Sequence, residues 1–427
     1  MFERLRFLYN RIGEKLWIKP LVTCVLSIMI VFLIKQVDYY EIDQFFPEVN
    51  KNSIEMLLSI IASSMLAIAT FAVGSMVSAY NSASRTATPR SFPLIISDDE
   101  SQNALSTFIG TFIFSVISLM VLKNGYYGKS ARFMIFTLTL IVLGVVIVTF
   151  VRWVDSIARL GRLGRIINKV EKATDDALQR RRLAPTLGGV PSGQLKPVGQ
   201  AVYGNSIGYV QRIEMAGLQG TAERLQLQIM VDALPGTFVA PGRALAYVTT
   251  DSGTLSKKDT DQIAKTFLIG GDRTFDEDPQ FGLVVLSEIA IRALSPAVND
   301  PGTAIDVIGT LVRLFTHWSK TVEDDNSRDF KDDSRDFKYD RVMVPEISLW
   351  DMFDDAFNAI ARDGAGAIEV VVRLQKAFQA LALIGDPKIR EVAMFQARLA
   401  LARAELSLDL PEDLDIARKA TKLVGTF

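Results

Sequence analysis

The sequence predicts an α-helical integral membrane protein with four transmembrane helices, followed by a cytoplasmic α+β domain. Three observations lead to this prediction: four long apolar stretches in the first third of the chain, basic residues that flank them on one side, and a long C-terminal region of mixed polarity. Hydrophobic residues make up 49% of the chain, which is high for a soluble protein. The net charge is only −1, so bulk charge indicates neither a nucleic-acid binder nor a disordered acidic chain.

The four apolar stretches are expected to span a bilayer, because crossing its hydrocarbon core takes about 20 apolar residues. The expected spans are residues 17–37, 54–80, 103–122 and 133–154. The first is short, but no small-x-small cleavage site follows it, so we interpret it as an anchor and not as a signal peptide. Residues 1–16 are expected to form a cytoplasmic interfacial helix.

Basic residues set the expected orientation. They precede the first span (Arg4, Arg6, Arg11, Lys15), follow the second (Arg85, Arg90) and follow the fourth (Arg152, Arg159, Arg162, Arg165). The opposite loop, residues 38–51, is acidic. The positive-inside rule therefore predicts a protein of the bacterial inner membrane with both termini in the cytoplasm.

The second span carries small and hydroxylated residues at steps of three and four, which places them on one helical face. These residues are Ser59, Ser63, Ala67, Thr70, Gly74 and Ser78. The stripe has two interpretations: close helix packing through small residues, or the wall of a water-filled path. Residues 56–84 carry no charge and would extend over about 40 Å, so the helix is expected to continue beyond the membrane. No ionisable residue lies inside a predicted span, which favours a passive pore or an anchor over a pump.

The pattern of apolar and polar residues divides the predicted cytoplasmic region into three parts. Residues 155–184 are expected to form a helical extension and the start of a linker, residues 185–250 a small β module, and residues 251–427 a helical bundle. The turn at Pro235–Leu245 resembles that of lipoyl and biotinyl barrel-sandwich domains. No lysine lies between Lys196 and Lys257 to carry such a group, so we expect a barrel-sandwich-like module without a cofactor.

Helix starts are expected near Asp278, Asp300, Ser348, Gly366, Asp386 and Pro411. Asp300 followed by Pro301 matches a capped helix start, which explains these residues without a ligand, although an exposed helix N-terminus also attracts anions. The segment Ser327–Lys331 recurs as Ser334–Lys338, and we expect both copies to lie in a loop.

Two stretches together resemble a bacterial family of predicted membrane proteins known as domain of unknown function 2254. They are residues 79–90, and residues 273–278 with 293–304. The resemblance implies four spans plus a cytoplasmic domain and no assigned activity. It singles out a membrane-proximal motif at an inner mouth (Arg85, Pro89, Arg90) and a candidate ligand or ion site (Arg273, Asp276, Asp278, Asn299, Asp300, Thr303).

Little in the sequence indicates catalysis. Asp276, Asp278 and Asp300 would bind a divalent cation only if the fold gathers them. The single cysteine, Cys24, excludes an intrachain disulfide, and the single histidine, His317, has no carboxylate close in sequence. Because no phosphate loop or nucleophile elbow is present either, we expect no catalytic residues and no enzyme.

The sequence favours an oligomeric ion channel or pore. In this hypothesis the second spans of several copies surround an axis, the acidic outer loop concentrates cations, and the cytoplasmic domain acts as a gate or vestibule. The expected partners are the lipid bilayer, further copies of the chain and inorganic ions. The alternative is a non-conducting scaffold or sensor that binds a partner or small ligand through its cytoplasmic domain.

Overall fold

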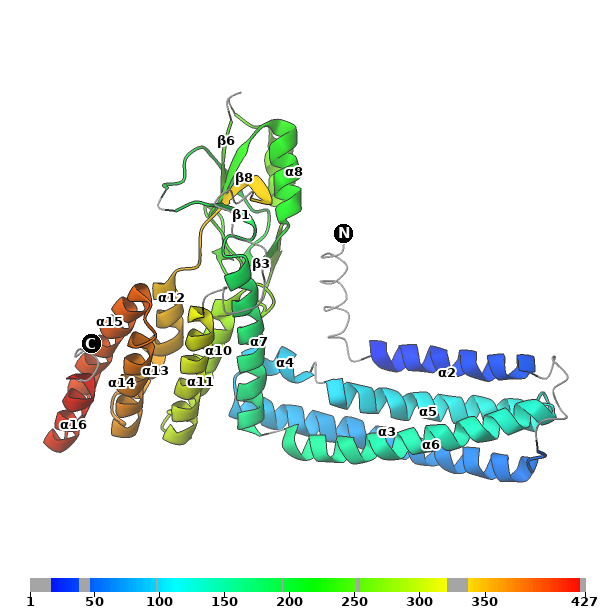
Figure 1. Cartoon of the computed structure of the whole chain (residues 1–427). Helices are drawn as coiled ribbons and strands as arrows, with labels where there is room; N and C mark the ends of the chain where they lie inside the picture. Colours follow the sequence, from blue (N-terminus) through cyan, green and yellow to red (C-terminus); the bar gives the residue numbers. More distant parts are fainter. Residues whose placement is uncertain are drawn as a thin grey trace. The chain divides into compact units, whose positions relative to one another are not determined.

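Four long helices dominate the N-terminal part of the computed structural model (Figure 1). The structure describes residues 17–37, 47–96, 99–160, 162–193, 195–250, 254–320 and 337–422. The expected interfacial helix, most of the acidic loop and nearly all of the duplicated Ser-Arg-Asp-Phe-Lys segment lie outside these residues. The chain divides into two units, residues 1–166 and 167–427.

The helices of the first unit match the expected spans. They are α2 (Ile18–Val37), α3 (Lys51–Thr86), α5 (Asp99–Lys123) and α6 (Lys129–Leu160), with the short η3 (Pro89–Ser91) and α4 (Phe92–Ile96) between α3 and α5. By length and composition all four are able to cross a membrane. With 36 residues, α3 extends over about 54 Å, which agrees with the expectation that it exceeds a bilayer span.

Small residues bring α2 and α5 close together. The Thr23 hydroxyl donates to the Ser106 carbonyl at 3.1 Å, and the Ser27 hydroxyl donates to the Gly110 carbonyl at 3.0 Å. A methyl group at Gly110 would lie 3.1 Å from Thr23 Cβ. In apolar surroundings such close backbone approach is a main source of helix association.

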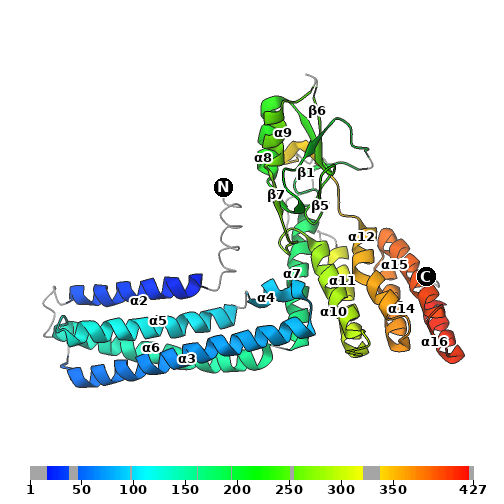
Figure 2. The ribbon, with the colours of Figure 1, turned by 180° about the vertical axis from the view of Figure 1, so that it is seen from behind.

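The second unit begins with α7 (Leu163–Leu183), most of which belongs to it, and continues into two β-sheets (Figure 2). The larger sheet has the order β1 (Gly189–Pro191), β8 (Tyr339–Val344), β4 (Gln228–Val231), β6 (Ala244–Thr249) and β2 (Gln200–Tyr203). The smaller sheet has the order β5 (Phe238–Val239), β3 (Gly208–Ile213) and β7 (Phe267–Gly270). Helices α8 (Met215–Leu225) and α9 (Lys257–Ala264) pack with them around one apolar core.

The β module differs from the expected residues 185–250. Strands β7 and β8 come from the range expected to be helical, and α8 interrupts the strand pattern. Strand β8 pairs in parallel with β1 and β4, more than 100 residues away in sequence, so no local pattern could indicate it. These sheets give no confirmation of a barrel-sandwich fold.

The remaining helices form an all-helical part whose starts agree with the capping signals. They are α10 (Pro279–Ala293), α11 (Pro301–Ser319), α12 (Leu349–Phe353), the π-helical turn η5 (Asp354–Asn358), α13 (Ala359–Asp363), α14 (Ile368–Ala382), α15 (Pro387–Glu405) and α16 (Pro411–Lys422). Ser348 caps α12 and Asp386 caps α15. Four fully buried rings (Phe315, Phe353, Phe357, Phe378) pack between α11, α12, η5 and α14.

The contact between α2 and α5 predicts that Gly110→Leu lowers the melting temperature in detergent. Extra methylenes in a packed contact cost about 1–3 kcal/mol. Gly144→Leu is the matched control, because no atom lies within 4 Å of a methyl group built at Gly144 in α6. Equal melting temperatures for the two variants would contradict this account of the packing.

Candidate functional site

The stripe on α3 does not face the other described helices. All six of its residues are exposed, and no atom lies within 4 Å of a methyl group built at Gly74. The opposite face of α3 is buried and apolar, with Leu58, Met65, Ala69, Ala72 and Met76. Among the described residues, packing within one chain therefore does not explain the stripe.

The membrane-proximal motif forms a tight turn after α3. The Arg85 backbone lies in the last turn of α3, and its side chain lies outside the described residues. Pro89 is the first residue of η3, where the buried Thr88 hydroxyl accepts from the Arg90 N–H at 3.4 Å. The local role of Pro89 and Arg90 is thus to start a short helix between α3 and α4.

Arg273 and Asp278 form a buried ion pair at the start of α10. Arg273 Nε and Nη2 donate to Asp278 Oδ2 and Oδ1 at 2.6 and 2.9 Å, and the Phe281 N–H donates to the same carboxylate at 3.1 Å. Asp278 is only 2% exposed, and this burial raises its pKa against the opposing effect of Arg273. Two-point pairing with an arginine gives a buried carboxylate charge-assisted hydrogen bonds in place of those to water.

The turn between β4 and β5 closes over this pair. Gly236 has φ +95°, and a methyl group there would lie 2.5 Å from Asp278 Oδ2. Only glycine meets both conditions, because other residues rarely adopt this φ and any Cβ would collide with the carboxylate. The Pro235-Gly236 turn is therefore explained by its contact with Asp278.

A cleft of about 430 Å³ opens in front of Arg273. It lies between the β4–β5 turn on one side and α10, α12 and η5 on the other. Five carboxylates line it: Asp232, Glu346, Asp351, Asp354 and Asp355. Arg273 already pairs with Asp278, and Asp232 pairs with Arg243 at 3.3 Å, so the acidic surface of the cleft comes mainly from the other four carboxylates.

Asp355 is the carboxylate most affected by its surroundings. Burial raises its pKa to about 6, in spite of the attraction of Arg273 and with further repulsion from Asp278, Asp351 and Asp354. Gln280 Nε2 donates to its Oδ2 at 3.1 Å. Asp355 lies on the π-helical turn η5, an irregularity that is frequent at functional sites.

The second motif lies at the other end of α10. Asn299 has φ +49°, and Asp300 caps α11 by accepting from the Thr303 N–H at 3.1 Å and the Thr303 hydroxyl at 2.6 Å. These hydrogen bonds lower the pKa of Asp300. Helix α10 has 15 residues and separates the two motifs by about 22 Å.

The fold does not gather the candidate carboxylates into a metal site. Asp278 pairs with Arg273, Asp300 caps α11, and the backbone carbonyl of Asp276 accepts from Arg180. No group of three or more potential metal ligands occurs among the described residues. The six candidate site residues therefore form two separate structures, and Arg273 of the first borders the acidic cleft.

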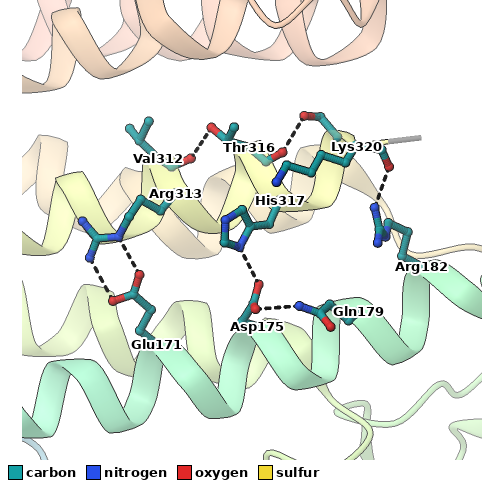
Figure 3. Close-up of polar contacts among 10 residues, drawn as sticks. Glu171, Asp175, Gln179, Arg182, Val312, Arg313, Thr316, His317 and Lys320 are labelled. Carbon is teal, nitrogen blue, oxygen red and sulfur yellow. Dashed lines mark hydrogen bonds and ion pairs between the residues drawn. The ribbon is translucent and has the colours of Figure 1, made fainter. Parts of the chain in front are cut away.

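Polar contacts join α7, from Glu171 to Arg182, to α11 and the residue that follows it (Figure 3). Glu171 accepts two hydrogen bonds from Arg313 at 2.7 and 2.8 Å, and Asp175 Oδ1 lies 3.1 Å from His317 Nδ1. Nearer the C-terminal end of α7, Arg182 donates to the Lys320 carbonyl at 2.7 Å. The expectation that His317 lacks a nearby carboxylate holds only in sequence, because its partner is 142 residues away.

Sequence reasoning missed the acidic wall of the cleft and the role of α7. One signal was available: Asp351, Asp354 and Asp355 have the spacing of residues on one helical face. The pairing of that face with Arg273 was not visible, because the residues are about 80 positions apart.

Comparison with known proteins identifies relatives of the chain. A family model described as "Predicted membrane protein (DUF2254)" matches residues 13–380. Uncharacterized proteins of Mycobacterium bovis and Mycobacterium tuberculosis are each 31% identical to the chain over 126 residues. This segment is 29% of the chain and 24% of each relative, so the chain matches about a quarter of the relatives' length. No solved structure matches the chain significantly.

The raised pKa of Asp355 predicts a pH dependence of stability. Between the ordinary carboxyl pKa of about 4 and the folded value of about 6, the folded state retains a proton that the unfolded state has lost. Stability should therefore fall as pH rises through this window and stay reduced above it. Asp355→Asn should remove this dependence and raise the melting temperature at pH 7.5 by about 2–4 °C, on the order of 1 kcal/mol after allowance for solvent screening.

Thermal melts of the full-length protein between pH 4.5 and 8 measure this effect. Asp354→Asn is the matched control, because Asp354 is an exposed neighbour on the same turn. A lower melting temperature for Asp355→Asn at pH 7.5, or an unchanged pH slope, would contradict the assignment.

Proposed function

The chain belongs to the DUF2254 family of predicted membrane proteins, and on that premise we propose that it forms an oligomeric ion channel or pore in the bacterial inner membrane. Helices α2, α3, α5 and α6 span the bilayer, and the positive-inside rule places both termini in the cytoplasm. The C-terminal unit then acts as a vestibule or gate. The proposal assigns no catalytic step and no cofactor.

The exposed stripe on α3 is the observation that supports this proposal most directly. A helix face that meets only lipid usually carries large apolar side chains, whereas small residues mark close approach to another helix. The Ser63 hydroxyl donates to the Ser59 carbonyl at 3.0 Å, and the Thr70 hydroxyl donates to the Leu66 carbonyl at 2.9 Å. Their oxygens remain able to accept from water or to contact a cation.

Several copies of α3 gathered around an axis would place these hydroxyls along a path. The absence of charge in residues 56–84 fits passive conduction, because pumps place ionisable groups at membrane depth. The acidic outer loop would concentrate cations at one mouth. The partners in this proposal are lipid, further copies of the chain and inorganic cations.

Ser63→Leu and Thr70→Leu are predicted to reduce unitary conductance in planar bilayers by about half or more, because leucine would narrow and dry the path. Ser64→Leu is the matched control, since Ser64 is also exposed on α3 but lies outside the stripe. A folded, oligomeric protein that stays silent in bilayers would exclude the channel. Equal effects at positions 63 and 64 would exclude the stripe as its lining.

A second candidate function, a sensor without conduction, is favoured by the acidic cleft. Its volume is within the range of small-ligand sites, about 300–1,000 Å³, and its five carboxylates would attract a cationic ligand. In this alternative the membrane helices serve as an anchor, and the cytoplasmic unit reports the ligand.

The sensor predicts that magnesium, calcium or spermidine, tested one at a time, raises the melting temperature. At ten times its dissociation constant a ligand stabilises by about 1.4 kcal/mol. Asp351→Asn should weaken the shift, and Asp409→Asn, an exposed carboxylate that does not line the cleft, should leave it unchanged. If none of the three cations has an effect, cation sensing is excluded.

A further inference from the structure

The C-terminal turn of α7 holds the loop that carries Arg273 and Asp278. Arg180 Nη2 donates to the Asp276 carbonyl at 2.7 Å, and Arg181 Nη2 donates to the Glu277 carbonyl at 3.2 Å. Both carbonyls lie in the short segment between the two partners of the buried ion pair. The end of α7 is thus fastened to the inner wall of the acidic cleft.

Burial of the charged Arg181 side chain is energetically unfavourable. Its side chain is 4% exposed, and its Nη1 has no hydrogen-bond partner within the part of the chain that the structure describes. Burial lowers its pKa, and the charges of Glu277 and Asp278 oppose this effect. The attraction of Glu277 is the larger of the two, and that of Asp278 comes second. Glu277 also pairs with Arg212 at 3.2 Å, so Arg181 shares Glu277 with a second arginine and is also attracted by Asp278.

Asp278 is therefore shared between two arginines. Arg273 binds both of its oxygens, and Arg181 acts on it through space. Arg273 is in turn attracted by Asp355 across the cleft. The four groups Asp355, Arg273, Asp278 and Arg181 form a row of alternating charges that runs from the cleft to α7.

The surroundings of Asp355 make it the variable member of this row. The charged groups that face it are Arg273 and Asp278 before α10, Asp351 on α12 and Asp354 on η5, while Gln280 on α10 donates to it. Asp232 and Glu346 line the same cleft. Neutralising Asp355 removes one of the two carboxylates that attract Arg273.

We propose that this charge row couples the charge state of the cleft to the end of α7. When a proton or a bound cation neutralises Asp355, Asp278 becomes the main carboxylate that attracts Arg273. The attraction between Asp278 and Arg181 then weakens. The last turn of α7 then loosens from the Asp276 and Glu277 carbonyls. Helix α7 follows α6 in the chain, and the change concerns the end of α7 that is farther from α6 in sequence.

Two of the three contacts between α7 and α11 lie before the changing end of α7, and the third, from Arg182 to the Lys320 carbonyl, lies within it. The Glu171–Arg313 and Asp175–His317 pairs (Figure 3) lie about two to three turns before Arg181. Thr174 is packed against α10, where a methyl group at Gly282 would lie 1.9 Å from Thr174 Oγ1. These contacts do not involve the charge row, so they should persist when Asp355 is neutralised.

Hydrogen–deuterium exchange of the full-length protein in detergent tests the proposal. At pH 7.5, Asp355→Asn should speed amide exchange in residues 178–183 about fivefold, the lower end of common allosteric couplings, and leave residues 167–175 unchanged. Wild type at pH 5.5, corrected for intrinsic exchange, should show the same local change. Asp354→Asn is the matched control and should show no change at α7.

A double-mutant cycle identifies the path. In an Arg181→Met background, which keeps the apolar stem and removes the charge, Asp355→Asn should have no further effect on α7. If Arg181→Met does not fold, Arg273→Lys serves in its place, because lysine cannot bind both oxygens of Asp278. An Asp355→Asn effect that is absent, or unchanged in both backgrounds, would overturn the proposal.

The proposal uses the cleft of the second candidate function but needs no conduction. Silent bilayers would exclude the channel and leave the exchange result intact. A failed cation screen would leave the proton as the neutralising species, which the comparison of pH 5.5 with pH 7.5 measures separately.

Discussion

The C-terminal unit is organised around one buried carboxylate, Asp278. A charge at 2% exposure that loses its partner costs roughly 3–5 kcal/mol, a large share of the net stability of about 5–15 kcal/mol typical of a domain. The start of α10 and the turn that contains Gly236 contact this group, and the end of α7 donates to the carbonyl of the preceding residue, Glu277. The need to give the Asp278 carboxylate hydrogen-bond and charge partners therefore constrains the start of α10, the β4–β5 turn and the end of α7.

Small residues have two different uses in the apolar helices. On α5, Ser106 and Gly110 face α2 and accept hydrogen bonds from it, so their smallness is explained within the chain. On α3 the equivalent residues face away from the buried side. The sequence alone left close packing and a water-filled path as alternatives for that stripe. Among the described residues, packing inside one chain no longer accounts for it, so any packing role requires a second molecule.

Local sequence signals allowed part of this structure to be predicted. The parts that depend on pairing between residues far apart in sequence were not predictable. Four apolar helices follow from composition, and the caps at Asp300, Ser348 and Asp386 follow from residues within one turn of each helix start. The pairing of β8 with β4 joins residues more than 100 positions apart, and Arg313 finds Glu171 across 142 residues. Neither partner carries a pattern that points to the other. The acidic spacing at residues 351–355 was visible, but its meaning depended on such a pairing.

The separation of the two motifs by α10 decides which of them is able to transmit a signal. Asp300 and Thr303 bond mainly to each other within one helical turn, so a change there ends at the start of α11. Asp278 instead has partners in the preceding loop, in α10 and in α7. Coupling between distant parts requires an element whose arrangement both parts bias. Among the candidate residues that the structure describes, the Arg273–Asp278 pair meets this condition, because it borders the cleft on one side and supports Arg181 on the other.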